Sequence, residues 1–309
     1  MQGRQKSFLH FFYPSKFFRM NLEQPYLLNL STEKIYLMAK KKKNPDAEMT
    51  LMDHLNELRG LLFRAAIAIV VTSTVCYIYS KFIFDNIIFA PKSSNFITYQ
   101  WLCKLSAILQ SKVLCFGTFD YKIINLHMSG QFMSDMYVSF FGGLIVAFPY
   151  ILLQLWKFIK PALHEKEKKY SRGAVGTMSF LFLAGVLFGY FLIVPLTINF
   201  FGKYLVSNTV ADQWQLDTYI STITNITFGM GVVFEIPVFI FFLSRIGILT
   251  PAFMRRTRKY AFFIILIIAA IIAPPDVVSL MMVTIPLYGL YEVGIFFSAR
   301  AAKKDALKE

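Results

Sequence analysis

The stretch that decides the fold is Thr227-Phe-Gly-Met-Gly-Val-Val-Phe-Glu-Ile-Pro-Val-Phe-Ile-Phe-Phe242, an apolar run with a carboxylate, Glu235, in its middle. An ionised side chain at the centre of a bilayer costs at least ~2.5–3.5 kcal/mol, so such a residue is a candidate functional site. The structural alternative is a neutral Glu235 that hydrogen-bonds inside a helix bundle and holds it together. The sequence leaves both interpretations, and the charge state, open.

The composition places most of the chain in a membrane. Of the 309 residues, 56% are hydrophobic and 33 are phenylalanine, and the mean hydropathy is +0.52. These values are too apolar for a soluble domain of this length. The net charge of +14 comes from basic residues that cluster between apolar runs. This clustering indicates membrane topology, and without a recognition motif we expect no nucleic-acid partner.

Six apolar runs predict six transmembrane helices and an all-α integral membrane protein. The runs are 61–83, 136–159, 174–201, 218–246, 260–273 and 277–298. Lysine and arginine are concentrated before the first run, between the second and third, between the fourth and fifth, and after the sixth. The positive-inside rule therefore places both termini in the cytoplasm.

Prolines within the spans predict bent helices that form a concave wall, because each proline removes a backbone donor. They are Pro149, Pro195, Pro237 and Pro286. In the third span, Gly185-Val-Leu-Phe-Gly189 has the spacing of small residues that allows close helix packing.

The fifth and sixth spans are predicted to be short. About 15 helical residues separate Lys259 from Asp276, which gives ~23 Å for a hydrocarbon core of ~30 Å. Two short crossings and a re-entrant hairpin both return the chain to the cytoplasm. The turn Pro274-Pro-Asp276 favours two crossings, because a polar turn is costly in lipid.

The termini are predicted to lie outside the membrane domain. Residues 1–48 are expected to be a disordered cytoplasmic extension, 49–300 the six-span domain, and 301–309 a cytoplasmic tail. Met38 precedes Ala-Lys-Lys-Lys-Lys, as a natural start would, so residues 1–37 are interpreted as a misassigned start or as part of the extension.

Cys103 and Cys115 share the long loop 84–135. They could form a disulfide if that loop faces an oxidising compartment, and two free thiols are the alternative. The chain has no Walker A, Gly-x-Ser-x-Gly or His-Glu-x-x-His motif, and its four histidines lack ligand spacing. We therefore expect no enzyme activity, no cofactor and no metal site.

Carboxylates also lie next to the spans. Glu57 belongs to Met52-Asp-His-Leu-Asn-Glu-Leu-Arg59, whose leucines recur at helical spacing and predict an amphipathic interfacial helix that enters the first span. The alternative for Glu57 is a plain solvated face of that helix. For Glu165 and Glu167, the alternative is an ordinary loop with salt-bridged charges.

A series of short motifs runs along the chain in order. They are His54-Leu-Asn-Glu-Leu-Arg59, Ala90-Pro91, Gln154-Leu-Trp-Lys-Phe158, Pro161-Ala-Leu163, Glu167-Lys-Lys169, Phe234-Glu-Ile-Pro237, Pro274-Pro-Asp276 and Pro286-Leu-Tyr-Gly-Leu-Tyr-Glu292. Together they resemble the TatC family, the multispanning component of the twin-arginine protein translocase, over residues 49–300. The sequence departs from the family's pattern in the long 84–135 loop and at Ser279-Leu280, where the family has Ser-Gln.

The resemblance implies a non-enzymatic receptor for the twin-arginine signal peptides of folded cargo, powered by the proton motive force. It implies small single-span partners of the TatA or TatB type, membrane lipids, a homo-oligomeric complex, and a bacterial plasma-membrane location. Signal-peptide contacts carry over to His54, Glu57, Leu58, Arg59, Phe158, Pro161 and Glu167. Intramembrane or lumen-facing roles carry over to Pro91, Gln154, Glu235, Pro237, Asp276 and Glu292.

Within a TatC-like chain, Glu235 is expected on the concave, partly hydrated wall left by bent helices. The competing hypothesis is a proton-coupled small-solute transporter that uses Glu235 as a relay beside Pro237. No inverted repeat relates the two halves, which counts against it. A third option, an intramembrane enzyme, lacks a visible nucleophile–base pair.

Overall fold

The computed structural model describes residues 51–93, 95–108, 121–159, 173–204, 207, 213–245 and 247–306. The chain divides into two compact units, Met1–His54 and Leu55–Glu309. The predicted extension 1–48 and the last three residues of the predicted tail lie outside the described residues. The rest of the fold concerns the second unit alone.

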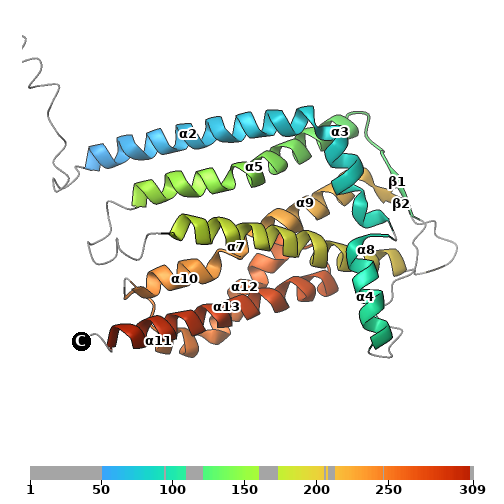
Figure 1. Cartoon of the computed structure of the whole chain (residues 1–309). Coiled ribbons are helices and arrows are strands. Elements are labelled where there is room, and N and C mark those ends of the chain that lie inside the picture. Colours follow the sequence, from blue (N-terminus) through green and yellow to red (C-terminus); the bar gives the residue numbers. More distant parts are fainter. Residues whose placement is uncertain are drawn as a thin grey trace, which may run out of the picture. The chain divides into compact units, whose positions relative to one another are not determined.

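The first half of this unit contains two long helices with shorter elements between them (Figure 1). Its elements are α2 (Leu51–Ile78), α3 (Ser80–Ile83), the π turn η1 (Phe84–Ile88), the 3₁₀ turn η2 (Ala90–Lys92), α4 (Ile97–Ile108), β1 (Lys122–Ile124) and α5 (Gly130–Ile159). Pro91 stands at the start of η2, where a proline's missing N–H costs nothing.

The second half is helical except for one short strand. Its elements are α7 (Ala174–Phe188), the π turn η5 (Gly189–Ile193), α8 (Val194–Lys203), β2 (Gln213–Gln215), α9 (Leu216–Val233), α10 (Ile236–Arg245), α11 (Pro251–Arg256), α12 (Arg258–Ile272) and α13 (Val277–Ala306). The helix α13 thus continues into the segment predicted as a tail.

All six predicted spans are helical. Among the described residues, five stretches are long and apolar enough to cross a membrane: Leu55–Ile78, Gly130–Ile159, Ala174–Lys203, Leu216–Ser244 and Val277–Arg300. The predicted fifth span forms α12, whose 15 residues give only ~22 Å. The apolar stretch of the sixth span has 24 residues, fewer than the 29 or 30 of the three middle spans but as many as the first.

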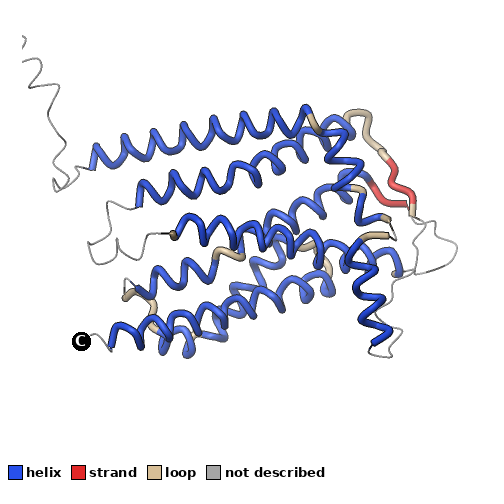
Figure 2. Tube along the Cα trace, in the orientation of Figure 1, coloured by secondary structure: helices blue, strands red, loops and turns tan. Residues whose placement is uncertain are grey.

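Two of the predicted bends coincide with a change in helix type. The π turn η5 comes immediately before Pro195, and the chain leaves helical geometry at Phe234 and Glu235, immediately before Pro237 (Figure 2). Each proline removes a donor from the helix ladder, so the preceding turn widens or breaks. Pro149 and Pro286 lie inside α5 and α13 without ending them.

The core of the unit surrounds α9. Ile220, Ile223, Ile226 and Met230 on this helix are each at most 2% exposed, and α5, α7 and α12 pack around it. The backbones of α7 and α9 approach closely, because a Cβ added at Gly185 would lie 2.6 Å from the carbonyl oxygen of Met230. The close packing predicted from the glycine spacing is confirmed.

An open groove of about 770 Å³ hollows the surface where α2, η1, α5, η5 and α9 meet. Its lining is largely apolar, including Val138, Phe141 and Leu187, and it also includes Thr224 and Thr227, whose hydroxyl oxygens are buried. This groove agrees with the prediction, made from the prolines, that bent helices form a concave wall.

Two short strands join loops that the sequence alone did not connect. β1 and β2 pair in parallel, with Lys122 opposite Gln213 and Ile124 opposite Gln215. Next to this ladder, the Tyr121 ring stacks on Trp214 with centroids 4.1 Å apart. Burial raises the pKa of Tyr121 to about 12, so its hydroxyl stays neutral at physiological pH. An otherwise all-α fold therefore has a small β clasp at one end.

The long helices alternate in direction, so the connections gather at two ends of the bundle (Figure 1). One end has the start of α2, the end of α5, the start of α7 and the ends of α10 and α13. We call it the basic end, because the lysine- and arginine-rich connections belong there. The opposite end carries α4 and the β clasp.

Candidate functional site

The predicted signal-peptide residues of the first span lie on α2 at the basic end. α2 runs without interruption from Leu51 to Ile78, so the amphipathic segment and the span form one helix, as expected. The side chains of Glu57 and Arg59 are exposed, and that of Leu58 is half-buried. The side chain of His54 lies outside the described residues.

Glu57 lies on the face of α2 that turns toward the protein. Residues four apart share one helix face, and Leu61 and Ala65, the next two positions on this face, are each 8% exposed. Glu57 comes one turn before them and is exposed. Its carboxylate is therefore open to a ligand at the edge of the buried face.

On α5, the predicted residues Gln154 and Phe158 are four apart and share a face. The Gln154 side chain is 6% exposed, and that of Phe158 is half-buried. The Arg64 guanidinium donates from Nη1 to Oε1 of Gln154 at 3.3 Å, which joins α2 to α5. Pro161 and Glu167 lie outside the described residues, so the structure does not place the second predicted carboxylate.

A shallow hollow of about 450 Å³ adjoins this part of α2. It is lined by Leu55, Leu58, Arg59, Leu62, Phe63 and Ala66. An exposed carboxylate accepts two parallel hydrogen bonds from a guanidinium. By helix periodicity the hollow lies on the face of α2 opposite Glu57, and its apolar surface takes aliphatic side chains. The basic end of α2 therefore offers a partner for an arginine on one face and for apolar side chains on the other.

Glu235 is not on a hydrated wall, which corrects the expectation from the sequence. Its side chain is 2% exposed, and among the described residues neither carboxylate oxygen has a hydrogen-bond partner. At the start of this break α7 packs closely against Phe234, where a Cβ added at Gly185 would lie 2.7 Å from the Cβ of Phe234. A buried carboxylate without a partner favours the neutral form.

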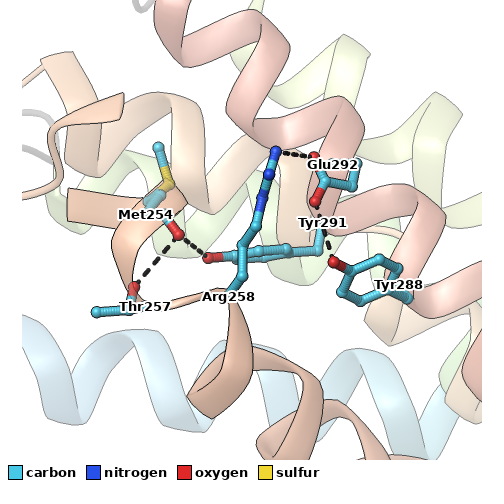
Figure 3. Close-up of polar contacts among 6 residues, drawn as sticks. All are labelled: Met254, Thr257, Arg258, Tyr288, Tyr291 and Glu292. Carbon is cyan, nitrogen blue, oxygen red and sulfur yellow. Dashed lines mark hydrogen bonds and ion pairs between the residues drawn. The ribbon is translucent and has the colours of Figure 1, made fainter. Parts of the chain in front are cut away.

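Glu292 is paired across two helices (Figure 3). Its Oε2 accepts a hydrogen bond from Nη2 of Arg258 at 2.8 Å, and its Oε1 accepts one from the Tyr288 hydroxyl at 3.2 Å. The Tyr291 hydroxyl donates to the Met254 carbonyl at 3.0 Å. These contacts attach α11 and the start of α12 to α13, and they give Glu292 a structural role at the basic end.

Asp276 and Pro91 also serve the fold. The Ser279 N–H donates to Oδ1 of Asp276 at 2.7 Å, so Asp276 caps the start of α13. The Tyr99 hydroxyl donates to the Pro91 carbonyl at 3.0 Å, which ties η2 to α4. Cys103 lies on α4, but Cys115 is outside the described residues, and their disulfide stays a prediction.

Two site residues were missed from the sequence, Arg64 and Arg258. The sequence did offer a signal for Arg64, because it is one of two cations inside the apolar run 61–83, with Lys81, and stands seven residues after Glu57. The sequence offered no signal for Arg258, because this residue lies in the connection between the fourth and fifth spans among several other arginines and a lysine. In the part of the chain that the structure describes, no group of three or more histidine, cysteine or acidic residues is placed to hold a metal.

Known proteins match most of this chain. The family model for the Sec-independent protein translocase protein (TatC) matches residues 53–286. TatC of Blattabacterium sp. subsp. Periplaneta americana (strain BPLAN) is 39% identical over 264 residues, which cover 85% of this chain and 99% of that protein. TatCy of Bacillus subtilis (strain 168) is 32% identical over 257 residues, which cover 83% of this chain and 91% of that protein.

The fold is similar to that of a solved relative. A crystal structure of the twin-arginine translocase receptor TatC superposes with a TM-score of 0.64 and 30% sequence identity, covering 81% of this chain and 99% of the other. The chain therefore belongs to the TatC family of Sec-independent protein translocase proteins.

Proposed function

We propose that this membrane protein is the receptor subunit of a twin-arginine translocase and that it binds the signal peptides of folded cargo at the basic end. The observation that carries the proposal is the exposed Glu57 carboxylate on the protein-facing side of α2, in a chain of the TatC family. Membership of the TatC family makes the protein a translocase component with several spans. The peptide-binding site at Glu57 is what we propose beyond that.

The chemistry of Glu57 supports a preference for arginine over lysine. A carboxylate binds the planar guanidinium through two parallel hydrogen bonds, whereas the lysine ammonium is a point charge without that fork. The shallow hollow around Leu58 and Leu62 supports binding of an apolar segment at the same end of α2, on the face opposite Glu57. A second carboxylate would match the second arginine, and the family resemblance assigns that role to Glu167.

The remaining parts of the proposal rest on charge pattern and family. The basic end fits the cytoplasmic side of a bacterial plasma membrane, which would put both termini there. Small single-span Tat subunits and further copies of this chain are the proposed partners. The sequence contains no Walker A loop. The proton motive force is therefore the proposed energy source, and its membrane potential supplies ~2.3 kcal/mol per charge per 100 mV.

The transporter alternative is not favoured. It needs Glu235 to exchange protons with a water-filled path, but this side chain is only 2% exposed.

The test is crosslinking of the purified protein to a twin-arginine signal peptide and to its twin-lysine variant. Glu57→Ala should weaken arginine-peptide binding by ~10–100-fold, because a hydrogen bond to a charged group contributes ~1.5–3 kcal/mol. Asn56→Ala is the matched control, since Asn56 is an exposed neighbour on the same helix. Equal labelling by both peptides, or normal export of folded cargo by the Glu57→Ala protein, would contradict the proposal.

A further inference from the structure

α2 is the least buried of the spanning helices. Within its most apolar 18-residue stretch, 6% of the residues are buried, compared with 28% for α5 and 44% for the span that contains α9. α2 lies at the edge of the bundle, next to α5 (Figure 1). A helix with so little burial is positioned by a few specific contacts.

The first contact is a close crossing of α2 over α5. The Thr72 hydroxyl donates to the Gly143 carbonyl at 2.8 Å, and a Cβ added at Gly143 would lie 2.5 Å from the backbone nitrogen of Ser73. The two backbones touch here, so a larger side chain at this position would force them apart. The crossing is a fixed point about which α2 is oriented.

The second contact is the hydrogen bond between Arg64 and Gln154. Arg64 lies eight residues from Thr72 toward the basic end, ~12 Å along the helix. Its guanidinium is exposed, whereas the Gln154 amide is 6% exposed and belongs to the packed face of α5. The bond thus connects a long, flexible side chain of α2 to a buried acceptor of α5.

The candidate peptide site continues from this bond toward the basic end. Glu57 is seven residues from Arg64, about two turns or ~10 Å, and Phe158 is about one turn beyond Gln154. Residues separated by whole turns lie on the same face of a helix. Glu57 therefore lies on the same stripe, or helix face, of α2 as Arg64. Phe158 lies on the same stripe of α5 as Gln154, so the hydrogen bond joins the two stripes. The Arg64–Gln154 bond is thus the contact that joins these two helix faces nearest to the candidate peptide site.

We propose that the Arg64–Gln154 hydrogen bond is a latch that holds the peptide-binding end of α2 against α5, and that Arg64 is a positioning residue for that site. This inference rests on the proposed function for its biological meaning. When the bond is absent, α2 turns about the crossing at Gly143, and Glu57 moves away from the stripe that carries Phe158. When the bond is present, the two stripes face one another at a fixed spacing.

A distance measurement tests the latch without any peptide. Spin labels are attached through Asn56→Cys and Lys157→Cys, two exposed positions on α2 and α5, in a background in which Cys76, Cys103 and Cys115 are replaced by serine. Arg64→Leu should lengthen and broaden the distance distribution, and so should Gln154→Leu. The double variant should match the single ones, because both remove one bond. Ile67→Leu is the matched control, since Ile67 is 49% exposed on α2 within one turn of Arg64 and lies outside the hollow.

Two conservative variants keep the test valid if a leucine variant fails to fold. Gln154→Glu gives Arg64 a charged partner and should narrow the distribution relative to the parent chain. Arg64→Lys retains a donor and should fall between the parent and Arg64→Leu. An unchanged distribution in both would overturn the latch, and so would additive effects in the double leucine variant.

Peptide affinity supplies the second readout. Arg64→Leu and Gln154→Leu should each weaken twin-arginine peptide binding by about three- to tenfold, and the double variant no further. Full affinity together with a lengthened distance would overturn the positioning role of Arg64. Failure of the proposed function would look different: the parent chain would bind twin-arginine and twin-lysine peptides equally, whatever the distances are.

Discussion

At the residue scale, the buried carboxylate of Glu235 is the feature that the structure changes most. Both of its oxygens are buried without a hydrogen-bond partner among the described residues, at the point where α9 ends and α10 begins. A charge there would be uncompensated, and the neutral acid avoids that cost. Glu235 therefore packs inside the protein where α9 and α10 meet, and it does not line a path open to water.

This interpretation predicts that Glu235→Gln retains much of the export activity and stability, because the amide has the same shape and no charge. Glu235→Ala should destabilise the protein by ~2–4 kcal/mol through the cavity it leaves. Thermal unfolding in detergent and export of a folded reporter would measure both. Val232→Ala serves as a control, since Val232 is 42% exposed on α9, three residues before Glu235. Equal damage from Gln and Ala would mean that an ionisable carboxylate is required.

At the element scale, the contact between α7 and α9 is set by glycine. Gly185→Ala should destabilise the protein by ~1–3 kcal/mol, because the new Cβ would meet the Met230 carbonyl oxygen at 2.6 Å. Gly176→Ala on the same helix has no atom within 4 Å and should be neutral or stabilising by up to ~1 kcal/mol. Unfolding of the two purified variants gives the comparison. The same shift in both would show that helix propensity, and not packing, decides the result.

The length of α12 leads to a second prediction at this scale. Its 15 residues are too few for a hydrocarbon core of ~30 Å, so the bilayer is expected to thin around it. Four added leucines, about one turn, should reduce export while membrane insertion stays normal. The control is an insertion of equal length in the loop at Gly247–Leu249. Full activity of the lengthened α12 would argue against thinning.

At the scale of the whole molecule, the two ends of the bundle should face different compartments. An impermeant thiol reagent should label Met128→Cys, near the β clasp, in intact cells. It should label Ile248→Cys, at the basic end, only after permeabilisation. Met128 is 106% exposed and Ile248 is 65% exposed, so access to the reagent is not limited by the fold. Labelling from the opposite sides would reverse the orientation predicted from charge.

The sequence by itself determined the helices, their order and the basic end. Hydropathy and charge act over a few neighbouring residues, so the six spans and the exposed Glu57 on a continuous α2 could be predicted. The family motifs added the site on α2 and α5, of which the structure describes Glu57, Leu58, Arg59 and Phe158.

Only the tertiary structure decided which of these residues meet. The Arg64–Gln154 bond joins residues 90 positions apart, and the β clasp pairs Lys122 with Gln213. The burial of Glu235 depends on the helices that pack around the break between α9 and α10. Such contacts depend on how helices pack in three dimensions, and local periodicity carries no information about them.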